Sequence, residues 1–280
     1  MTPSSVRVDI GGVALNVHEF GEGPPIVMIP PGPGLDGSVF FPWFERLQGH
    51  RLLAVDLTGH GQSDRGDPDH WAVADWASDV VRLAEALELQ DYTLLGHSFG
   101  ARVALQHAVD HPGRAARVIC SGGIAHGEAL AHMDETFEAW GTPEQRKSVE
   151  AAFEAEETVE TPADCHAAWM GMMPFFLAEP DGPALADIDR NWSDVRYSPE
   201  MHRHEGFGHY DVRPSLPGVT VPVLVITGKQ DHITRPAESE EIAALLPNAT
   251  LELLDGAGHF PFAERPAEYL GAMAAWLDRV

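Results

Sequence analysis

The sequence of 280 residues predicts an α/β fold, in which helices flank a mostly parallel sheet and a helical cap is inserted into it. Short apolar runs that end at turn residues alternate with helical periodicity over the first 120 residues. Strand signals then disappear between about residue 125 and residue 211, and they return afterwards. A serine flanked by glycines, Ser98, joins an apolar strand to a periodic helix.

The first half of the chain supplies five expected strands and a long helix. Two strands form a hairpin across Gly11 and Gly12, and the later strands are short apolar runs. A helix of the size expected here, separating two strands, indicates a parallel sheet with right-handed crossovers. The expected strands cover residues 6–10, 14–20, 26–29, 52–56 and 92–95, and the helix covers 71–89.

The region from residue 125 to residue 211 differs in composition from its surroundings. It is rich in Ala, Glu, Met and Trp, is interrupted by prolines, and holds 19 acidic residues against 5 basic ones. After it, two strands and two helices complete the sheet domain, at residues 221–227, 236–246, 249–254 and 266–277. We therefore expect one α/β core, residues 1–124 and 212–280, and one helical cap, residues 125–211.

The charge balance excludes some classes of partner. With 18 basic and 43 acidic residues the formal charge is −25, which argues against binding nucleic acid or an anionic membrane surface. The acidity either serves solubility or favours cationic substrates. Two cysteines are too few for a disulfide framework, and there is no secretory h-region and no apolar run of about 18 residues. We expect a cytoplasmic protein that acts on a small molecule, and the sequence leaves its oligomeric state open.

Residues Gly96-His97-Ser98-Phe99-Gly100 predict a nucleophile elbow. The turn must be sharp so that the serine oxygen stands clear above the sheet, and glycines two residues either side remove steric clashes. The pentapeptide alone is weak, but between an apolar strand and a helix at residues 102–110 it is specific. Ser98 is therefore the predicted nucleophile.

A serine nucleophile needs a base and an acid that orients the base, in the chain order serine, acid, histidine. Asp231 follows the strand at 221–227, and His259 follows the strand at 249–254. Both lie just beyond strand ends, where open α/β sheets build their sites. Among the 15 histidines, His97 is expected to point away from the nucleophile and His60 to hold a loop. Asp231 and His259 are the predicted acid and base.

Acyl transfer also needs N–H donors for the developing oxyanion. One is expected from the backbone of Phe99, at the start of the helix after Ser98. The other is expected from the loop Pro30-Pro31-Gly32-Pro33-Gly34, in which the three prolines have no N–H to donate. Of the two glycines, Gly32 is the predicted donor.

These motifs, with Val55-Asp56-Leu57-Thr58-Gly59-His60-Gly61-Gln62-Ser63-Asp64 and Gly258-His259-Phe260-Pro261, resemble the α/β-hydrolase superfamily outside the cap. The loop at residues 31–34 is similar to the His-Gly-Gly-Pro-Gly loop of prolyl aminopeptidases (proline iminopeptidases), with Pro30 in place of the histidine. In the cap, residues 203–210 resemble a segment of those enzymes whose glutamate holds the free amino group of the substrate. The resemblance implies that Glu205 binds substrate; otherwise Glu205 is one more solvated acid.

The predicted function is hydrolysis of an ester or amide bond of a small molecule through an acyl-enzyme, without a metal or organic cofactor. The proline-glycine loop and the acidic cap favour an aminopeptidase or amidase. The generic elbow, with the apolar segment at residues 169–176, favours a carboxylesterase or lactonase. A ligand receptor built on a hydrolase fold is the third alternative. Such a receptor would be labelled slowly by its ligand in a single turnover, without multiple turnover.

Overall fold

The computed structural model describes residues 3–202, 204 and 210–280. Across this part of the chain, eight strands form one sheet in the order β1-β2-β4-β3-β5-β6-β7-β8. Strand β2 is antiparallel to both of its neighbours, and every other neighbouring pair is parallel. The strands are β1 Ser4–Asp9, β2 Ala14–Phe20, β3 Pro25–Ile29, β4 Arg51–Val55, β5 Thr93–His97, β6 Arg117–Ser121, β7 Val223–Gly228 and β8 Ala249–Leu254.

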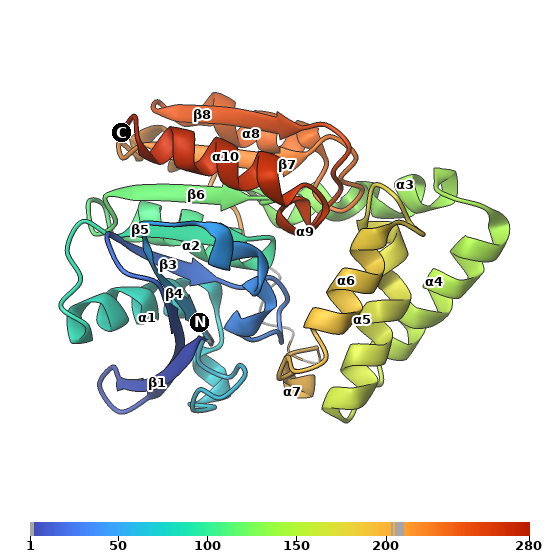
Figure 1. Cartoon of the computed structure of the whole chain (residues 1–280), viewed down its shortest axis with the longest axis horizontal. Helices are drawn as coiled ribbons and strands as arrows, with labels where there is room; N and C mark the ends of the chain where they lie inside the picture. Colours follow the sequence, from blue (N-terminus) through green and yellow to red (C-terminus); the bar gives the residue numbers. More distant parts are fainter. Residues whose placement is uncertain (1–2, 203, 205–209) are drawn as a thin grey trace.

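Helices cover both faces of the sheet (Figure 1). Because successive strand residues point to opposite faces, Val27 and Ile29 pack with helices α1, α2 and α8, whereas Ile26 and Met28 pack with α10 and the inserted helices. The helices are α1 Val73–Ala86, α2 Phe99–Asp110, α3 Met133–Ala139, α4 Pro143–Glu156, α5 Pro162–Phe176, α6 Pro183–Asn191, α7 Pro199–His202, α8 Pro236–Leu245, α9 Pro261–Glu264 and α10 Pro266–Leu277. Short 3₁₀ turns lie at η1 Gly37–Phe40, η2 Trp43–Arg46, η3 Pro68–His70, η4 Gly127–His132 and η5 Leu216–Gly218.

Helices α3 to α7 lie between β6 and β7 in the sequence and stand beyond the end of the sheet to which the β6 arrow points (Figure 1). Their starts follow from local sequence. Thr142 and Gln145 form a capping box at α4, and Thr161 and Asp164 form one at α5. In each box the side chain of one residue bonds the backbone N–H of the other, which satisfies donors that a helix start leaves unpaired. A proline occupies the first turn of both helices, where its missing N–H costs nothing.

The chain enters and leaves the inserted helices at adjacent points. His126 and Asp211 form an isolated antiparallel bridge, and beside it the N–H of Val212 donates to the carbonyl of Ala125 at 2.9 Å. A segment whose two ends meet at one bridge is connected to the sheet domain through a narrow neck. We propose this neck as the boundary of a cap that comprises residues 125–211.

The predicted fold class is confirmed, and β2, β8 and α10 have the predicted bounds. Helix α2 differs: it begins at Phe99, directly after Ser98, rather than at Arg102. The N–H of Ala101 already donates to the carbonyl of Ser98 at 3.0 Å, so the elbow and the first helical turn are one structure. Among the described residues, no helix combines the length and the apolar character that crossing a bilayer requires.

Candidate active site

Ser98 lies at the turn between β5 and α2 in a strained backbone conformation, with φ 54° and ψ −114°. A positive φ of this kind is disfavoured for a residue with a Cβ, at about 1–3 kcal/mol. Glycines make the turn possible: a Cβ at Gly96 would lie 2.0 Å from the carbonyl oxygen of Gly100. One at Gly100 would lie 2.2 Å from the carbonyl oxygen of Ile29. The sharp turn expected from the two glycines is therefore present.

Ser98, His259 and Asp231 form one hydrogen-bonded chain. The Oγ of Ser98 lies 2.8 Å from Nε2 of His259, and Nδ1 of His259 lies 2.8 Å from Oδ2 of Asp231. Because an ionised carboxylate can only accept, Nδ1 carries the proton that it donates to Asp231. Nε2 is then left to accept the hydroxyl proton of Ser98. The three residues follow β5, β7 and β8, so parallel strand ends bring them together.

The carboxylate of Asp231 is fixed by the turn that follows it. Its Oδ1 accepts hydrogen bonds from the backbone N–H groups of Ile233, at 2.8 Å, and Thr234, at 2.9 Å. The hydroxyls of Thr227 and Thr234 lie 3.2 Å and 2.9 Å from Oδ2, the oxygen that faces His259. A buried carboxylate with this many donors is held in one orientation. That orientation also fixes the imidazole plane.

His97 lies beside His259. Its ring is buried, with its centroid 5.2 Å from that of His259, and its Nδ1 lies 3.1 Å from Oγ of Ser121. Burial, together with the neighbouring His259, holds the pKa of His97 well below its usual range. His97 therefore packs against His259 as an uncharged ring.

The loop expected to supply an oxyanion donor passes beside the elbow. The carbonyl oxygens of Ile29 and Pro30 both lie within 3 Å of the point where a Cβ on Gly100 would stand. Two residues on, Gly32 has φ +133°, which glycine adopts readily. The N–H of Ser198, which lies between α6 and α7 of the insertion, donates to the carbonyl of Gly34 at 2.8 Å. The loop is therefore held from both the core and the insertion. Phe99 begins α2, whose N-terminus carries the partial positive charge of the helix dipole.

Aromatic side chains surround His259 on the side of the insertion. The ring of Phe176, the last residue of α5, lies 5.6 Å from the ring of His259. Trp169 contacts Phe176 at 5.8 Å, and Trp192 contacts Phe260 at 5.3 Å. These rings are buried. His259 thus lies in apolar surroundings, where a hydrogen bond is electrostatically stronger than in water.

Glu205, the predicted substrate-binding residue, lies outside the described residues. Two residues near the site were not found from the sequence. Thr234 lies three positions after Asp231, and this spacing allows its hydroxyl to bond the carboxylate of Asp231. The chemistry of turns could therefore have indicated Thr234 from the sequence. Glu264 folds back onto the backbone on both sides of His259. No spacing rule predicts that contact.

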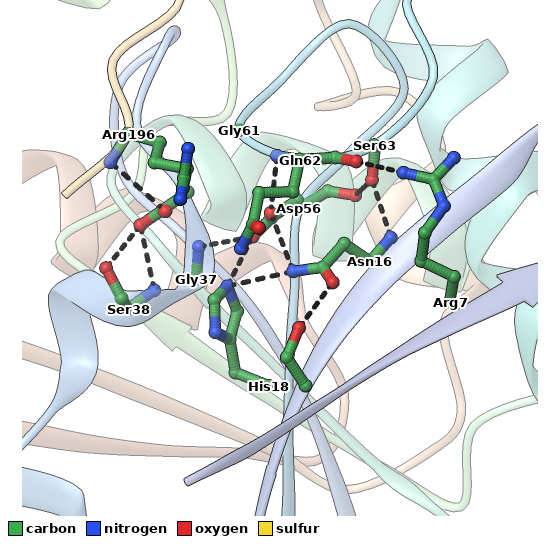
Figure 2. Close-up of polar contacts among 12 residues, drawn as sticks. Arg7, Asn16, His18, Gly37, Ser38, Asp56, Gly61, Gln62, Ser63 and Arg196 are labelled. Atoms are coloured by element: carbon green, nitrogen blue, oxygen red, sulfur yellow. Dashed lines mark hydrogen bonds and ion pairs between the residues drawn. The ribbon is translucent and has the colours of Figure 1, made fainter. Parts of the chain in front are cut away.

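One group of buried side chains has the residue types of a metal site: His18, Asp36 and Asp56, whose ligand atoms lie within 4.8 Å of one another. Figure 2 shows the contacts around them. Oδ1 of Asp56 lies 2.9 Å from both Nε2 of His18 and the N–H of Gly37. Its Oδ2 accepts from the side chain of Asn16 at 3.0 Å and from the N–H of Gln62 at 2.9 Å. Protein donors thus use the lone pairs with which Asp56 would bind a cation.

The same group joins three distant segments. Asp36 follows the proline-glycine loop, and its carboxylate accepts from the N–H of Ser38, at 3.0 Å, and the N–H of Arg196, at 3.1 Å. Burial and then the charge of Asp56 raise the pKa of Asp36 to about 6. Burial lowers the pKa of His18, but the hydrogen bond and charge of Asp56 outweigh it, and the net shift is upward. The arrangement suits a buried polar network that holds loops in place.

The comparisons agree with the fold. Residues 26–272 match the model of the alpha/beta hydrolase family. A 2-hydroxymuconate semialdehyde hydrolase of Pseudomonas putida is 27% identical, over 92% of this chain and 88% of the relative. A proline iminopeptidase of Lactobacillus helveticus is 25% identical, over 94% and 92%. The structure of an alpha/beta fold family hydrolase from Bacillus anthracis superposes with a TM-score of 0.82 at 21% identity, covering 98% of this chain and 99% of that one. The chain therefore belongs to the alpha/beta hydrolase family.

Proposed function

We propose that this chain is a serine hydrolase that cleaves an ester or amide bond of a small molecule through a covalent acyl-enzyme. The observation that carries the proposal is the chain of 2.8 Å contacts from Ser98 through His259 to Asp231. A hydroxyl, an imidazole and a carboxylate in this order are the parts of a nucleophile, its general base and the group that orients the base.

In the proposed reaction His259 takes the proton of Ser98 as Oγ forms a bond to the substrate carbonyl carbon. The carbonyl electron pair moves to oxygen, and the N–H groups of Phe99 and Gly32 stabilise the resulting oxyanion. His259 then gives the proton to the leaving alcohol or amine as its bond to carbon breaks. Water repeats the two steps on the acyl-enzyme, which releases the acid and restores Ser98.

An apolar ester is the proposed substrate class. The aromatic rings of Phe176, Trp169 and Phe260 near His259 support it, since they make the surroundings of the site apolar, as sites for apolar ligands are. The second candidate is the amide of an N-terminal proline, supported by the proline-glycine loop and by the relative named as a proline iminopeptidase. In that candidate the amine would be held by Glu205, which lies outside the described residues.

The test compares kcat/KM for short p-nitrophenyl esters, prolyl-aminomethylcoumarin and its N-acetylated form. We expect multiple turnovers on the esters and a loss of at least about a thousandfold in Ser98→Ala. Ser193→Ala, an exposed serine in the insertion, is the matched control. Cleavage of the proline amide that acetylation abolishes would instead establish the aminopeptidase. Covalent labelling of Ser98 without turnover would favour a ligand receptor, and turnover that survives Ser98→Ala would refute the mechanism.

A further inference from the structure

Glu264 makes an unusual set of contacts for a carboxylate on the face of a helix. It ends the short helix α9, and its side chain turns back toward the residues that precede the helix. Oε1 accepts hydrogen bonds from the N–H of Gly258 at 2.8 Å and from the N–H of Phe260 at 3.2 Å. These are the two residues that flank His259. One carboxylate oxygen therefore fixes the backbone on both sides of the proposed base.

The second oxygen of Glu264 reaches the inserted helices. Oε2 accepts from the N–H of Ala178, two residues after the end of α5, at 2.8 Å. A backbone bond runs parallel to this link: the N–H of His259 donates to the carbonyl of Phe176 at 2.7 Å. The two segments approach so closely that a Cβ on Gly258 would lie 2.5 Å from that carbonyl oxygen. Residues 176–178 and 258–260 are thus joined into one unit, and Glu264 bonds to both parts.

The charge state of Glu264 decides whether this unit holds. An ionised carboxylate can accept from all three N–H groups, and hydrogen bonds to a charged acceptor are stronger than neutral ones. A protonated carboxyl has a donor of its own, so one oxygen would present an O–H toward an N–H. Protonation would therefore weaken at least one of the three bonds and loosen the backbone around His259.

Burial raises the pKa of Glu264 to about 7, although the three N–H groups lower it and Asp231 raises it further. Charged residues from four neighbouring segments line a surface cavity of about 250 Å³ together with Glu264. They are Glu179 after α5, Arg265 before α10, Arg46 on η2 and Asp187 on α6. Arg265 and Glu179 pair at 3.6 Å. The cavity gives the carboxyl a route to solvent protons.

We propose that Glu264 is a positioning residue for His259. The ionised carboxylate of Glu264 keeps the imidazole of His259 aligned with Ser98 and links the backbone around His259 to the end of α5. The proposal rests on the proposed role of His259 as the base. Loss of the carboxylate charge lowers the chemical rate, because a displacement of about 1 Å in a reacting group costs on the order of a hundredfold. Substrate binding changes little, because Glu264 acts on the base through the backbone.

The kinetic test compares Glu264→Gln, which fixes the neutral state without changing size, with Glu268→Gln as the matched control. Glu268 is exposed on α10 and loses the same charge. On the ester substrate we expect kcat to fall by about 10- to 100-fold in Glu264→Gln, with KM within about twofold of the native value. Glu264→Asp, which keeps the charge on a shorter side chain, should recover part of the rate. Equal kcat in Glu264→Gln and Glu268→Gln would overturn the proposal.

The pH profile separates positioning from a merely structural role. In the native protein protonation of Glu264 lowers kcat/KM, so this group steepens the acidic limb of log kcat/KM. In Glu264→Gln the group no longer titrates, and the acidic limb becomes shallower. An acidic limb of unchanged slope in Glu264→Gln would contradict the proposed coupling.

A second measurement does not depend on activity. In the native protein the amide signals of Gly258, Phe260 and Ala178 should shift together with one midpoint near pH 7, followed by ¹H–¹⁵N NMR. Different midpoints for the three amide signals would overturn the positioning role of Glu264, and this test does not require Glu264→Gln to fold. If the three signals shift together but Ser98→Ala retains activity, the contacts of Glu264 stand and the proposed function is the part that fails.

Discussion

The backbone N–H of Ser98 donates a hydrogen bond to the carbonyl oxygen of Ser121 at 2.8 Å. The preceding residue, His97, is paired in register with Ser121 in the parallel ladder between β5 and β6. The ladder therefore extends one residue beyond the strand and sets the height of Ser98 above the sheet. A strained residue persists only where its surroundings over-determine it, and here the neighbouring strand supplies that constraint.

The elbow predicts a large effect for a single methyl group. Gly100→Ala should lower the free energy of unfolding by about 1–3 kcal/mol, because the new Cβ would lie 2.2 Å from the carbonyl oxygen of Ile29, which belongs to a buried strand. Urea unfolding followed by circular dichroism measures the change.

The matched control is Gly271→Ala. Gly271 lies within α10 and has open space where its Cβ would stand. Alanine should therefore raise the free energy of unfolding by about 0.5–1 kcal/mol through helix propensity. If both variants changed stability in the same direction, close approach at Gly100 would not be the constraint.

The sequence predicts the meeting of Ser98, Asp231 and His259 because each follows an apolar run that reads as a strand. Parallel strands place their carboxyl ends at one edge, so knowing the strand ends is nearly enough to place the side chains. For Gly32, the structure places its loop beside Gly100, whereas its role as an oxyanion donor stays a prediction.

Other contacts carry no periodic signal. His18, Asp36 and Asp56 come from β2, from the loop after β3 and from the residue after β4, and nothing in their spacing pairs them. Glu264 reaches Gly258 by reversing direction after a single helical turn. Such contacts depend on how two loops pack, and loop packing is set by tertiary structure rather than by local pattern.

Asp231→Asn should lower kcat by roughly ten-thousandfold and leave the fold intact. An asparagine amide can donate to Nδ1 of His259, which would put the imidazole proton on Nε2, the atom that must accept from Ser98. Asp255→Asn is the control, because Asp255 is exposed on the neighbouring loop and loses the same charge. Steady-state kinetics on the ester measures both. A loss smaller than about tenfold in Asp231→Asn would mean that another group orients the base.

Asp36 predicts a pH-dependent stability. Its pKa in the folded protein is about 6, raised from 3.8 by burial and by Asp56, so between these values the folded state binds more protons than the unfolded state. The stabilising contribution is fully present below about pH 3.8 and is lost as the pH rises through 6. Because the pKa of His18 is also raised, its contribution is likewise lost as the pH rises through its folded value.

Asp36→Asn removes that dependence. Because the N–H of Ser38 bonds Oδ1 of Asp36 and the N–H of Arg196 bonds Oδ2, the single oxygen of asparagine keeps only one of the two bonds, a loss that is the same at every pH. The variant should gain stability relative to the native protein as the pH rises from 4.5 to 7.5, measured by urea unfolding at each pH. Asp69→Asn, an exposed acid, should run parallel to the native protein. A constant difference between Asp36→Asn and the native protein across this range would mean that the pKa of Asp36 is not raised in the folded protein.

The two thiols should take no part in the chemistry. Cys120 and Cys165 are both buried, and burial raises the pKa of Cys120 to about 12 and that of Cys165 to about 11. Only the thiolate reacts with a disulfide reagent, so neither should react in the folded protein at pH 8. Ellman's reagent should report two thiols per chain only after urea is added, and iodoacetamide should leave ester turnover unchanged. Rapid inactivation by iodoacetamide, prevented by Cys120→Ala, would show that the interior beside β6 opens on the timescale of the assay. A rigid β5–β6 ladder that fixes the height of Ser98 above the sheet would then be the wrong description of the elbow.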